Sequence, residues 1–551
     1  MKAKIACLAC LVIVATLMAG STQPVFAPVV SYSSGGDQGR WVSVADVNRD
    51  GKLDLLVVNE CGSDGSTCAN STVGVLLGNG NGTFETAVSY KTGGHGLPLS
   101  GGFGTVSLAV ADVNSDGNPD LVVANGCAAS SPGTCLSDGT VGVLFGNGDG
   151  TFQPVVLYDS GGLYASTVVV ADVNGDGKPD VVVANLCGAT CANGVVGVLL
   201  GNGNGIFQQV ETYGSGGYQS YSVAVADINH DGKLDLLVTN FCPVSNSDCN
   251  NHLVNGTVGL LFGNGDGTFQ SAVISGSGGV FARSVAVADV NGDGKPDILI
   301  ANYISNSAGV LLGNGDGTFQ PAMSYSSGGS VGSVSIVVTD VNGDGSRDLV
   351  VANQCDNSGF CTNGSLGVLL GNGDGTFQPA ALYESGGTSA QSVTAADANG
   401  DGRPDVLVAN FCASSRNCPN GAAASVSVLI TTTPSVYQAL VQQPINADGS
   451  SVFSAKRGVI PVKFTLSGNN VPTCALPPAT ISVIRTANGT STSVDESTYS
   501  MAADTGSNFR IDPTACQYVY NLSLSSLNIG TYRVNISING IVVGHAVFAL
   551  Q

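Results

Sequence analysis

Short runs of valine, isoleucine and leucine alternate along most of this chain with segments rich in glycine, asparagine, aspartate and serine. One stretch shows the order: "FQPVVLYDSGG", starting at Phe152, is followed by "STVVVADVNGDGKPD", "VVVANLCGATCANG" and "VVGVLLGNGNG", and the order begins again at Phe207. Apolar runs of this length between turn-forming residues predict β-strands, four to each repeat. The adjacent Asn and Gly residues of "GNGNG" accept positive φ, so this segment predicts a tight hairpin between two strands.

The repeat recurs seven times at intervals of about 50 to 66 residues. Its most regular segment begins with an aspartate, and these aspartates are Asp46, Asp112, Asp172, Asp227, Asp289, Asp340 and Asp397. Four-stranded units that recur at this spacing predict a β-propeller, with seven blades over residues 26–430. The predicted fold class is therefore all-β.

The two ends of the repeated region predict how the propeller closes. The hairpin "GNG[DN]G" follows six of the seven aspartate loops and is missing after the last, where the chain runs "ASVSVLITTTP". The segment "FAPVVSYSSGG" at 26–36 precedes the first loop, and its Phe26 stands 20 residues before Asp46, the spacing found in other repeats. We expect this N-terminal strand to complete the last blade beside Ser425–Ile430, which would leave no open sheet edge.

Beyond about Thr433 the repeat stops and a different pattern begins. "VIPVKFTLSG" from Val459 and "TYRVNISI" from Thr531 place apolar residues at every second position. A period of two predicts strands with one buried face. The segment 436–551 is therefore predicted to form an immunoglobulin-like antiparallel β-sandwich, stapled by a disulfide between Cys474 and Cys516.

Each of the seven loops reads Asp-x-Asn-x-Asp-Gly-x-x-Asp, while position 4 varies among arginine, serine, glycine and histidine. Calcium takes six to eight oxygen ligands, which a tight loop supplies from alternate positions, with glycine at position 6 and a main-chain carbonyl at position 7. The loop resembles the start of an EF-hand, but position 12 of the third copy is Val183, in an apolar run, so the loop joins two strands. Asp, Asn and Gly also form ordinary turns, yet turn propensity alone does not explain seven loops with the same residues at four ligand positions.

We therefore predict about seven calcium sites, in which position 7 contributes its carbonyl. The predicted ligands are Asp46, Asn48, Asp50, Lys52 and Asp54; Asp112, Asn114, Asp116, Asn118 and Asp120; Asp172, Asn174, Asp176, Lys178 and Asp180; Asp227, Asn229, Asp231, Lys233 and Asp235; Asp289, Asn291, Asp293, Lys295 and Asp297; Asp340, Asn342, Asp344, Ser346 and Asp348; Asp397, Asn399, Asp401, Arg403 and Asp405.

The N-terminal residues and the charge indicate where the protein works. Residues 1–21 carry two lysines, an apolar stretch up to Ala19 and then small residues, which predicts a secretory signal peptide. Its apolar core is too short for a confident membrane span, and no other run of eighteen apolar residues follows, so we expect a secreted chain without a membrane span. The formal net charge of −21 argues against nucleic acid as a partner.

Cysteine usage agrees with export. Six pairs lie close together, each after a strand that ends in a sequence such as "VVAN": Cys61/Cys68, Cys127/Cys135, Cys187/Cys191, Cys242/Cys249, Cys355/Cys361 and Cys412/Cys418. Disulfides are the natural interpretation in an oxidising compartment. Zinc is the alternative, but the pairs lack a histidine or second cysteine pair at ligand spacing.

In its loop, strand order and blade number, the region 26–430 resembles the FG-GAP and VCBS repeat family, the calcium-looped propellers of integrin α-chains and many secreted bacterial proteins. The resemblance implies calcium in the loop between the first and second strands of each blade. It also implies that ligands bind the opposite face. Through "IPVKF" and "GTYRVNI", the last segment resembles the PxKF-type domain at the ends of secreted bacterial proteins.

Few residues suggest catalysis. The four histidines lie in unrelated places, and "GGSVG" around Ser330 precedes a strand rather than the helix that a nucleophile elbow needs. We expect a non-enzymatic recognition or adhesion protein, possessing calcium sites and an extracellular protein or polysaccharide partner. The alternatives are a polysaccharide-acting lyase or hydrolase, whose carboxylate pairs a sequence does not exclude, and a lectin on the same propeller.

Overall fold

The computed structural model describes residues 23–62, 70–95, 107–127, 138–243, 254–357, 363–413 and 423–432, and beyond these 437–442, 445, 451–454, 459–468, 471–473, 479–486, 494–499, 510–512, 517–523, 527, 530–538 and 541–550. The chain forms two compact units, Met1–Thr431 and Thr432–Gln551. Throughout the ranges just given, the regular elements are β-strands, and no helix is long and apolar enough to cross a membrane.

The first unit contains the strands β1 (Val25–Phe26), β2 (Val30–Ala45), β3 (Asp54–Gly62), β4 (Thr72–Leu76), β5 (Val88–Lys91), β6 (Ser107–Ala111), β7 (Asp120–Asn125), β8 (Asp138–Leu144), β9 (Val156–Ala171), β10 (Asp180–Cys187), β11 (Val195–Leu199), β12 (Glu211–Gly214), β13 (Tyr218–Ala226), β14 (Asp235–Cys242), β15 (Asn255–Leu261), β16 (Val273–Val280), β17 (Ala282–Ala288), β18 (Asp297–Asn302), β19 (Ser307–Leu311), β20 (Met323–Ser326), β21 (Val331–Thr339), β22 (Asp348–Cys355), β23 (Ser365–Leu369), β24 (Ala381–Glu384), β25 (Thr388–Ala396), β26 (Asp405–Cys412), β27 (Ala423–Leu429) and β28 (Thr431–Thr432).

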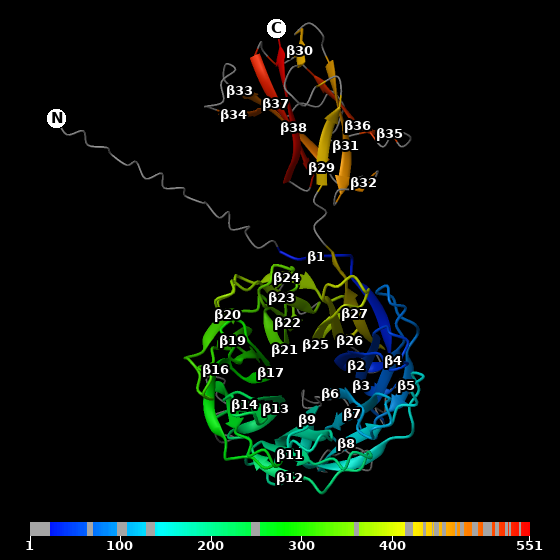
Figure 1. Cartoon of the computed structure of the whole chain (residues 1–551), viewed down its shortest axis with the longest axis vertical. Helices are drawn as coiled ribbons and strands as arrows, with labels where there is room; N and C mark the ends of the chain where they lie inside the picture. Colours follow the sequence, from blue (N-terminus) through cyan, green and yellow to red (C-terminus); the bar gives the residue numbers. More distant parts are fainter. Residues whose placement is uncertain are drawn as a thin grey trace, which may run out of the picture. The chain divides into compact units, whose positions relative to one another are not determined.

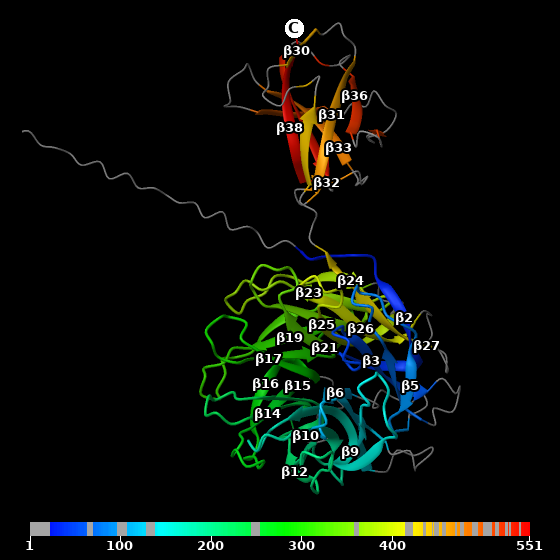
Figure 2. The same cartoon turned by 45° about the vertical axis from the view of Figure 1, so that its right-hand side comes forward.

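These strands form antiparallel sheets around a ring, which makes the unit propeller-like (Figures 1 and 2). Three sheets have four strands each, β13 to β16, β17 to β20 and β21 to β24, and two sheets have seven strands. In each seven-stranded sheet, one strand of 16 residues, β9 or β2, pairs through its first half with one neighbour and through its second half with the other. Figure 1 shows β2, β9, β13, β17, β21 and β25 on the inner side of the ring.

The N-terminal segment pairs with the end of the repeated region. Val30–Ser33 on β2 lies opposite Ser425–Val428 on β27, in the order β26-β27-β2-β3. Ahead of it, β1 pairs with β28, and the ring of Phe26 lies edge-on to the ring of Tyr383 with centroids 4.9 Å apart. Segments some 400 residues apart in sequence therefore share one sheet.

The core of the first unit lies between neighbouring four-stranded units. Val122 and Val143, for example, cluster with Val181 and Val183 of the following unit. The second strand of a unit is covered on both faces, and β10 is buried along its whole length. This burial explains why these strands read as continuous valine and leucine runs rather than as an alternation.

A buried asparagine explains two further recurring sequences, "SGG" and the "AN" near the end of the second strand. The Ser160 hydroxyl donates to Asn185 Oδ1 (2.6 Å), and Asn185 Nδ2 donates to the Ser160 carbonyl (2.9 Å). The same pair of bonds joins Ser34 to Asn59 and Ser215 to Asn240. Gly197 allows this approach, since a Cβ there would lie 2.1 Å from the Ser160 carbonyl oxygen.

The second unit is a pair of five-stranded sheets. Its strands are β29 (Tyr437–Gln442), β30 (Ser451–Phe453), β31 (Val459–Gly468), β32 (Val471–Thr473), β33 (Ala479–Thr486), β34 (Val494–Tyr499), β35 (Arg510–Asp512), β36 (Gln517–Ser523), β37 (Gly530–Ile538) and β38 (Ile541–Leu550). One sheet has the order β29-β31-β36-β35 with β32 beside β31, and the other β30-β38-β37-β33-β34. Val462 and Phe464 from the first sheet and Tyr532, Val534 and Ile536 from the second are buried in one core, as the alternation predicts. Cys474 and Cys516 lie outside the described residues.

Candidate metal centre

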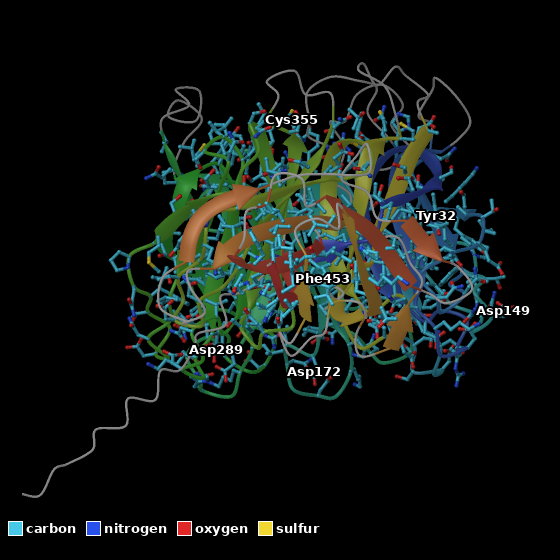
Figure 3. The ribbon with its side chains drawn as sticks, turned by 90° about the horizontal axis from the view of Figure 1, so that it is seen from above. Tyr32, Asp149, Asp172, Asp289, Cys355 and Phe453 are labelled. Atoms are coloured by element: carbon cyan, nitrogen blue, oxygen red, sulfur yellow. A yellow bond between two sulfur atoms is a disulfide. The ribbon has the colours of Figure 1, made fainter. Side chains whose placement is uncertain are left out.

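The seven aspartate loops occupy equivalent places. Each joins the first strand of a four-stranded unit to the second, as the loop from Asp172 joins β9 to β10. Antiparallel strands reverse direction, so the connection from the second strand to the third leaves from the opposite face. Figure 3 shows Asp172 and Asp289 at one face of the ring and Cys355 at the other.

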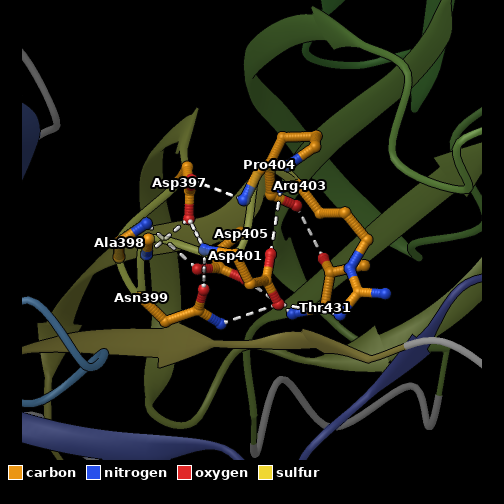
Figure 4. Close-up of polar contacts among 10 residues, drawn as sticks. Asp397, Ala398, Asn399, Asp401, Arg403, Pro404, Asp405 and Thr431 are labelled. Atoms are coloured by element: carbon orange, nitrogen blue, oxygen red, sulfur yellow. Dashed lines mark hydrogen bonds and ion pairs between the residues drawn. The ribbon is translucent and has the colours of Figure 1, made fainter.

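The side-chain oxygens of positions 1 and 3 turn to a common point. In the loop of Figure 4, the main-chain N–H of Asp401 donates both to Asp397 Oδ1 (3.0 Å) and to Asn399 Oδ1 (2.9 Å). The N–H of Gly402 donates to the other oxygen of Asp397 (2.7 Å). These three bonds recur in all seven loops at 2.7 to 3.2 Å. The loops are thus seven copies of one hydrogen-bonded structure.

Position 5 contacts position 7 of its own loop. The Arg403 N–H donates to Asp401 Oδ1 (3.0 Å), and Arg403 Nη2 lies 2.7 Å from Asp401 Oδ2. Lys52 Nζ forms the same ion pair with Asp50 (3.1 Å), and its hydrogen bond lowers the pKa of Asp50. These pairs are partly exposed, where solvent screens such interactions, so a bound cation would displace them at little cost.

Position 9 is buried and fastens the loop to the sheet. In the third loop, Asp180 accepts the N–H of Val173 (3.0 Å) and the N–H of Gly201 in the following hairpin (2.7 Å). The last repeat lacks that hairpin, and the N–H of Thr431 takes its place on Asp405 (2.7 Å). This double acceptor role escaped the sequence analysis, because the partner glycine stands 21 residues away and nothing local marks it.

Burial disfavours the charge at position 9. It raises the pKa of three of these carboxyls to about 6, and the negative charges at positions 5 and 1 raise the pKa further: Asp120, Asp348 and Asp405. In the other four loops burial raises the pKa in the same direction: Asp54, Asp180, Asp235 and Asp297. A cation among these carboxylates would relieve that repulsion.

Two residues of every loop have a left-handed backbone. Position 6 is glycine throughout, as at Gly51 (φ 81°). Position 4 has the same hand in all seven loops, even where it is Arg49 (φ 61°), Ser115 (φ 61°) or His230 (φ 58°). The varied residues at position 4 therefore conceal a backbone requirement that only glycine meets without strain.

The donor set of each loop is made only of oxygen. Among the described side chains, no group of three or more His, Cys, Asp and Glu is placed to hold a metal ion. Each loop combines two converging oxygens at positions 1 and 3, the carboxylates at positions 5 and 9 and a main-chain carbonyl. This is the ligand chemistry that calcium takes, and it does not suit zinc or copper.

One of the expected disulfides is present in full, between Cys187 and Cys191. Five more cysteines are disulfide-bonded: Cys61, Cys127, Cys242, Cys355 and Cys412. The cysteines that the sequence pairs with them lie outside the described residues: Cys68, Cys135, Cys249, Cys361 and Cys418.

The chain resembles known proteins over its repeated region. The FG-GAP-like repeat matches residues 63–123, 134–183, 185–238, 250–300, 289–351 and 340–408. Curated relatives include the phosphatidylinositol-glycan-specific phospholipases D of Mus musculus (32% identical over 183 residues, 31% of this chain), Bos taurus (33% over 181 residues, 30%) and Homo sapiens (32% over 177 residues, 30%). The match spans only about a fifth of these relatives, 22%, 21% and 21% of their lengths.

Two solved structures are similar to this chain at a low level. One is a lectin of Agrocybe aegerita that recognises non-reducing terminal N-acetylglucosamine, with a TM-score of 0.41 and 20% identity over 65% of this chain and 90% of the lectin. The other is BBS1N in complex with ARL6DN, with a TM-score of 0.44 and 10% identity over 74% of this chain and 98% of that one. At these values neither likeness bears on what this chain binds.

Proposed function

This chain belongs to the family of FG-GAP-like repeat proteins, and we propose that it is a secreted, calcium-binding recognition or adhesion protein that carries out no reaction of its own. The observation that carries the proposal is the sevenfold repetition of one loop structure on one face of the ring. A catalytic site is normally a single constellation, whereas seven equal loops suit a scaffold that holds another surface rigid.

We propose that the ring has seven blades and is closed by its N-terminal strand. Each seven-stranded sheet divides at its long strand into two four-stranded units, which with the three separate sheets gives seven. The pairing of β2 with β27 supports closure, because it gives the last unit its outer strand from the other end of the chain. A closed ring hides the sheet edges that would otherwise pair with other chains.

In each loop we propose that calcium is held by the side chains of positions 1, 3, 5 and 9 and by the carbonyl of position 7. The ion would supply positive charge where carboxylates crowd together, and so would stiffen the connection between the first two strands. The chain's own residues already fix the loop: the N–H groups of positions 5 and 6 orient the acceptor oxygens before any ion binds.

Export fits the same proposal. The N-terminal signal-like sequence at 1–21 and the disulfide-bonded cysteines both belong to chains that mature outside the cytosol. We assign the second unit as an immunoglobulin-like domain of the PxKF type on the strength of its two sheets and its "IPVKF" sequence. Its disulfide between Cys474 and Cys516 remains a prediction.

An enzymatic function is the second candidate, because the curated relatives are phospholipases D. The similarity spans about a fifth of those enzymes, so it does not carry their activity to this chain. Ser330, the one residue with a nucleophile-like sequence, uses its hydroxyl to contact the main-chain carbonyl of Asp356. A lectin or polysaccharide-cleaving function on the same propeller is the remaining alternative.

The test is to titrate the purified chain with calcium by calorimetry and then to score binding and cleavage separately on panels of polysaccharides and extracellular proteins. The proposal predicts multiple calcium sites and binding without turnover. Turnover of a polysaccharide or of a glycosylphosphatidylinositol anchor would favour the enzymatic alternative. If the chain binds no calcium, the proposal that metal-bound loops stiffen the propeller is wrong.

A further inference from the structure

The inner strands share an irregularity on the face opposite the aspartate loops. Near the start of the stretch that pairs with the second strand, the pairing slips by one residue in six of the inner strands, so that one residue has no partner across the ladder. The residue before each of them pairs with the buried asparagine of the second strand, so all of them lie at one level of the ring. They are Arg40, Ser166, Tyr221, Arg283, Val334 and Gln391.

These bulge residues touch one another from one unit to the next. Arg40 Nη1 donates to Gln391 Oε1 (3.4 Å). The Arg283 guanidinium lies 5.5 Å from the centre of the Tyr221 ring. Bulges re-aim side chains and are common beside binding sites, and here they gather two arginines at one level.

The two arginines differ in how their charge is satisfied. Arg40 Nε donates to Glu60 Oε2 (2.7 Å), and its guanidinium lies over the Phe411 ring at 4.7 Å. Glu60 directly follows Asn59 in β3, and in the four-stranded unit of Arg283 the equivalent residue, after Asn302, is Tyr303. An aromatic ring, Tyr303, therefore stands in the four-stranded unit of Arg283 at the place where the four-stranded unit of Arg40 has the carboxylate of Glu60.

Arg283 has no hydrogen-bond or carboxylate partner within the part of the chain that the structure describes. Its guanidinium lies 5.1 Å from the Tyr303 ring centre, in addition to the contact with Tyr221. Burial lowers the pKa of Arg283, and the like charge of Arg40 lowers it further. Cation–π contacts alone give the N–H groups of the guanidinium no hydrogen-bond acceptor.

The surroundings of Arg283 form a rigid aromatic wall. Phe241 stacks on Phe281 with ring centroids 3.5 Å apart, and Tyr221 lies against Phe241 at 5.4 Å. Phe281 has φ 65°, as the residues at the same place before the other bulges do, for example Gln219 (φ 56°) and Ser389 (φ 57°), so its backbone belongs to the bulge itself. Tyr303 is half-buried and donates its hydroxyl to Gln354 Oε1 (2.9 Å), which fixes the ring.

We propose that Arg283 binds the carboxylate of an acidic sugar, with the sugar ring against Tyr303 and Phe241, on the face opposite the aspartate loops. This inference rests on the proposed recognition function and names the class of its ligand. A guanidinium binds a carboxylate through two parallel N–H bonds, and half-exposed rigid rings give contact area at little entropic cost. Tyr303 and Phe241 place flat rings beside the guanidinium, which suits a sugar ring that carries a carboxylate better than a folded protein surface.

The experiment uses the full secreted chain in 1 mM calcium with trigalacturonate as the probe and its methyl ester as the neutral comparison, measured by calorimetry. The wild type should bind the acid and not the ester. Arg283→Gln should weaken binding about tenfold or more, as loss of hydrogen bonds to a charged group does. Arg283→Lys should retain part of the affinity. Lys91→Gln, which removes a positive charge from an exposed position of β5 outside the aspartate loops, should bind as the wild type does.

Equal binding of acid and ester, no binding of the acid at millimolar concentration, or full affinity in a folded Arg283→Gln variant would each overturn the inference. A lower melting temperature of Arg283→Gln with unchanged affinity would assign the arginine a structural role instead. Binding of a tetraglutamate peptide through Arg283 without binding of trigalacturonate would reassign the site to acidic proteins. In all these cases the recognition proposal stands, whereas cleavage of a polysaccharide would remove it.

Discussion

The ring of Tyr32 lies edge-on to the ring of Phe84, with centroids 5.7 Å apart and an interplanar angle of 85°. Tyr32 belongs to the part of β2 that pairs with β27, and Phe84 follows the hairpin of the first repeat. Successive repeats make the same contact elsewhere: Tyr90 with Phe152, Tyr158 with Phe207, Tyr213 with Phe269 and Tyr325 with Phe377. The N-terminal segment thus lies beside β27 at the position that an outer strand occupies in the other four-stranded units.

Phe84→Leu should therefore destabilise the first unit as much as Phe152→Leu, by about 1 kcal/mol each, because both lose one edge-to-face contact in a similarly buried position. The two phenylalanines have exposed fractions of 7% and 8%. Denaturant unfolding of both variants measures the losses. A much smaller loss for Phe84→Leu would mean that the N-terminal strand is not docked in solution.

Removal of calcium should lower the melting temperature. At about 1 mM calcium and a site constant of about 0.1 mM, each ion adds roughly 1.4 kcal/mol by mass action. Calorimetric melting in calcium, in chelator and in magnesium is the measurement, with magnesium as the control because it demands a stricter geometry. The same midpoint in calcium and in chelator would contradict the calcium assignment.

In chelator, acidification from pH 7.5 to 5.5 should raise the melting temperature. Burial raises the pKa of Asp120, Asp348 and Asp405 from 3.8 to about 6. The folded state therefore binds these protons more tightly than the unfolded state, and the penalty for their charge disappears as the pH falls through 6. With calcium present the direction should reverse, because metal ligands must be deprotonated. A fall in the melting midpoint both with calcium and in chelator would show that burial does not disfavour the charge on these carboxyls when no metal is bound.

His230→Gly should stabilise the protein, although it removes a side chain. His230 has φ 58°, and relief of a left-handed conformation outweighs the greater freedom of glycine in the unfolded chain by about 1 kcal/mol or less. His230→Ala is the matched control and should give no such gain, since alanine keeps the strain. If both variants melt at the same temperature, position 4 carries no backbone strain.

Asn185→Leu should cost about 1 to 3 kcal/mol, because it removes two buried hydrogen bonds to Ser160 and leaves the Ser160 hydroxyl only its longer contact with the Gly162 carbonyl (3.3 Å). Ser160→Ala and the double variant complete a cycle that isolates the coupling between the two side chains. We expect the double variant to be less destabilised than the sum of the single changes. Strict additivity would mean that the two side chains do not interact energetically.

The sequence by itself determined the strands, the seven aspartate loops and the hairpins, because these features depend on residues close together in the chain. Alternating apolar runs and turn residues encode local conformation. The glycine at position 6 predicts a left-handed turn for the same reason, and Gly51 adopts it. The partners of local bonds, such as position 5 with position 1, follow from the loop's own length.

The tertiary structure decided what each repeated residue does. Asp180 is buried because its loop meets a hairpin 21 residues later. Arg40 in β2 and Arg283 in β17 occupy equivalent bulges, yet one faces Glu60 and the other Tyr303. That difference arises only when the register aligns each inner strand with its second strand. A repeat makes its copies look alike in sequence, whereas the neighbours of each copy are set by the order of strands around the ring. Contacts between distant residues are therefore fixed by packing, which no local pattern specifies.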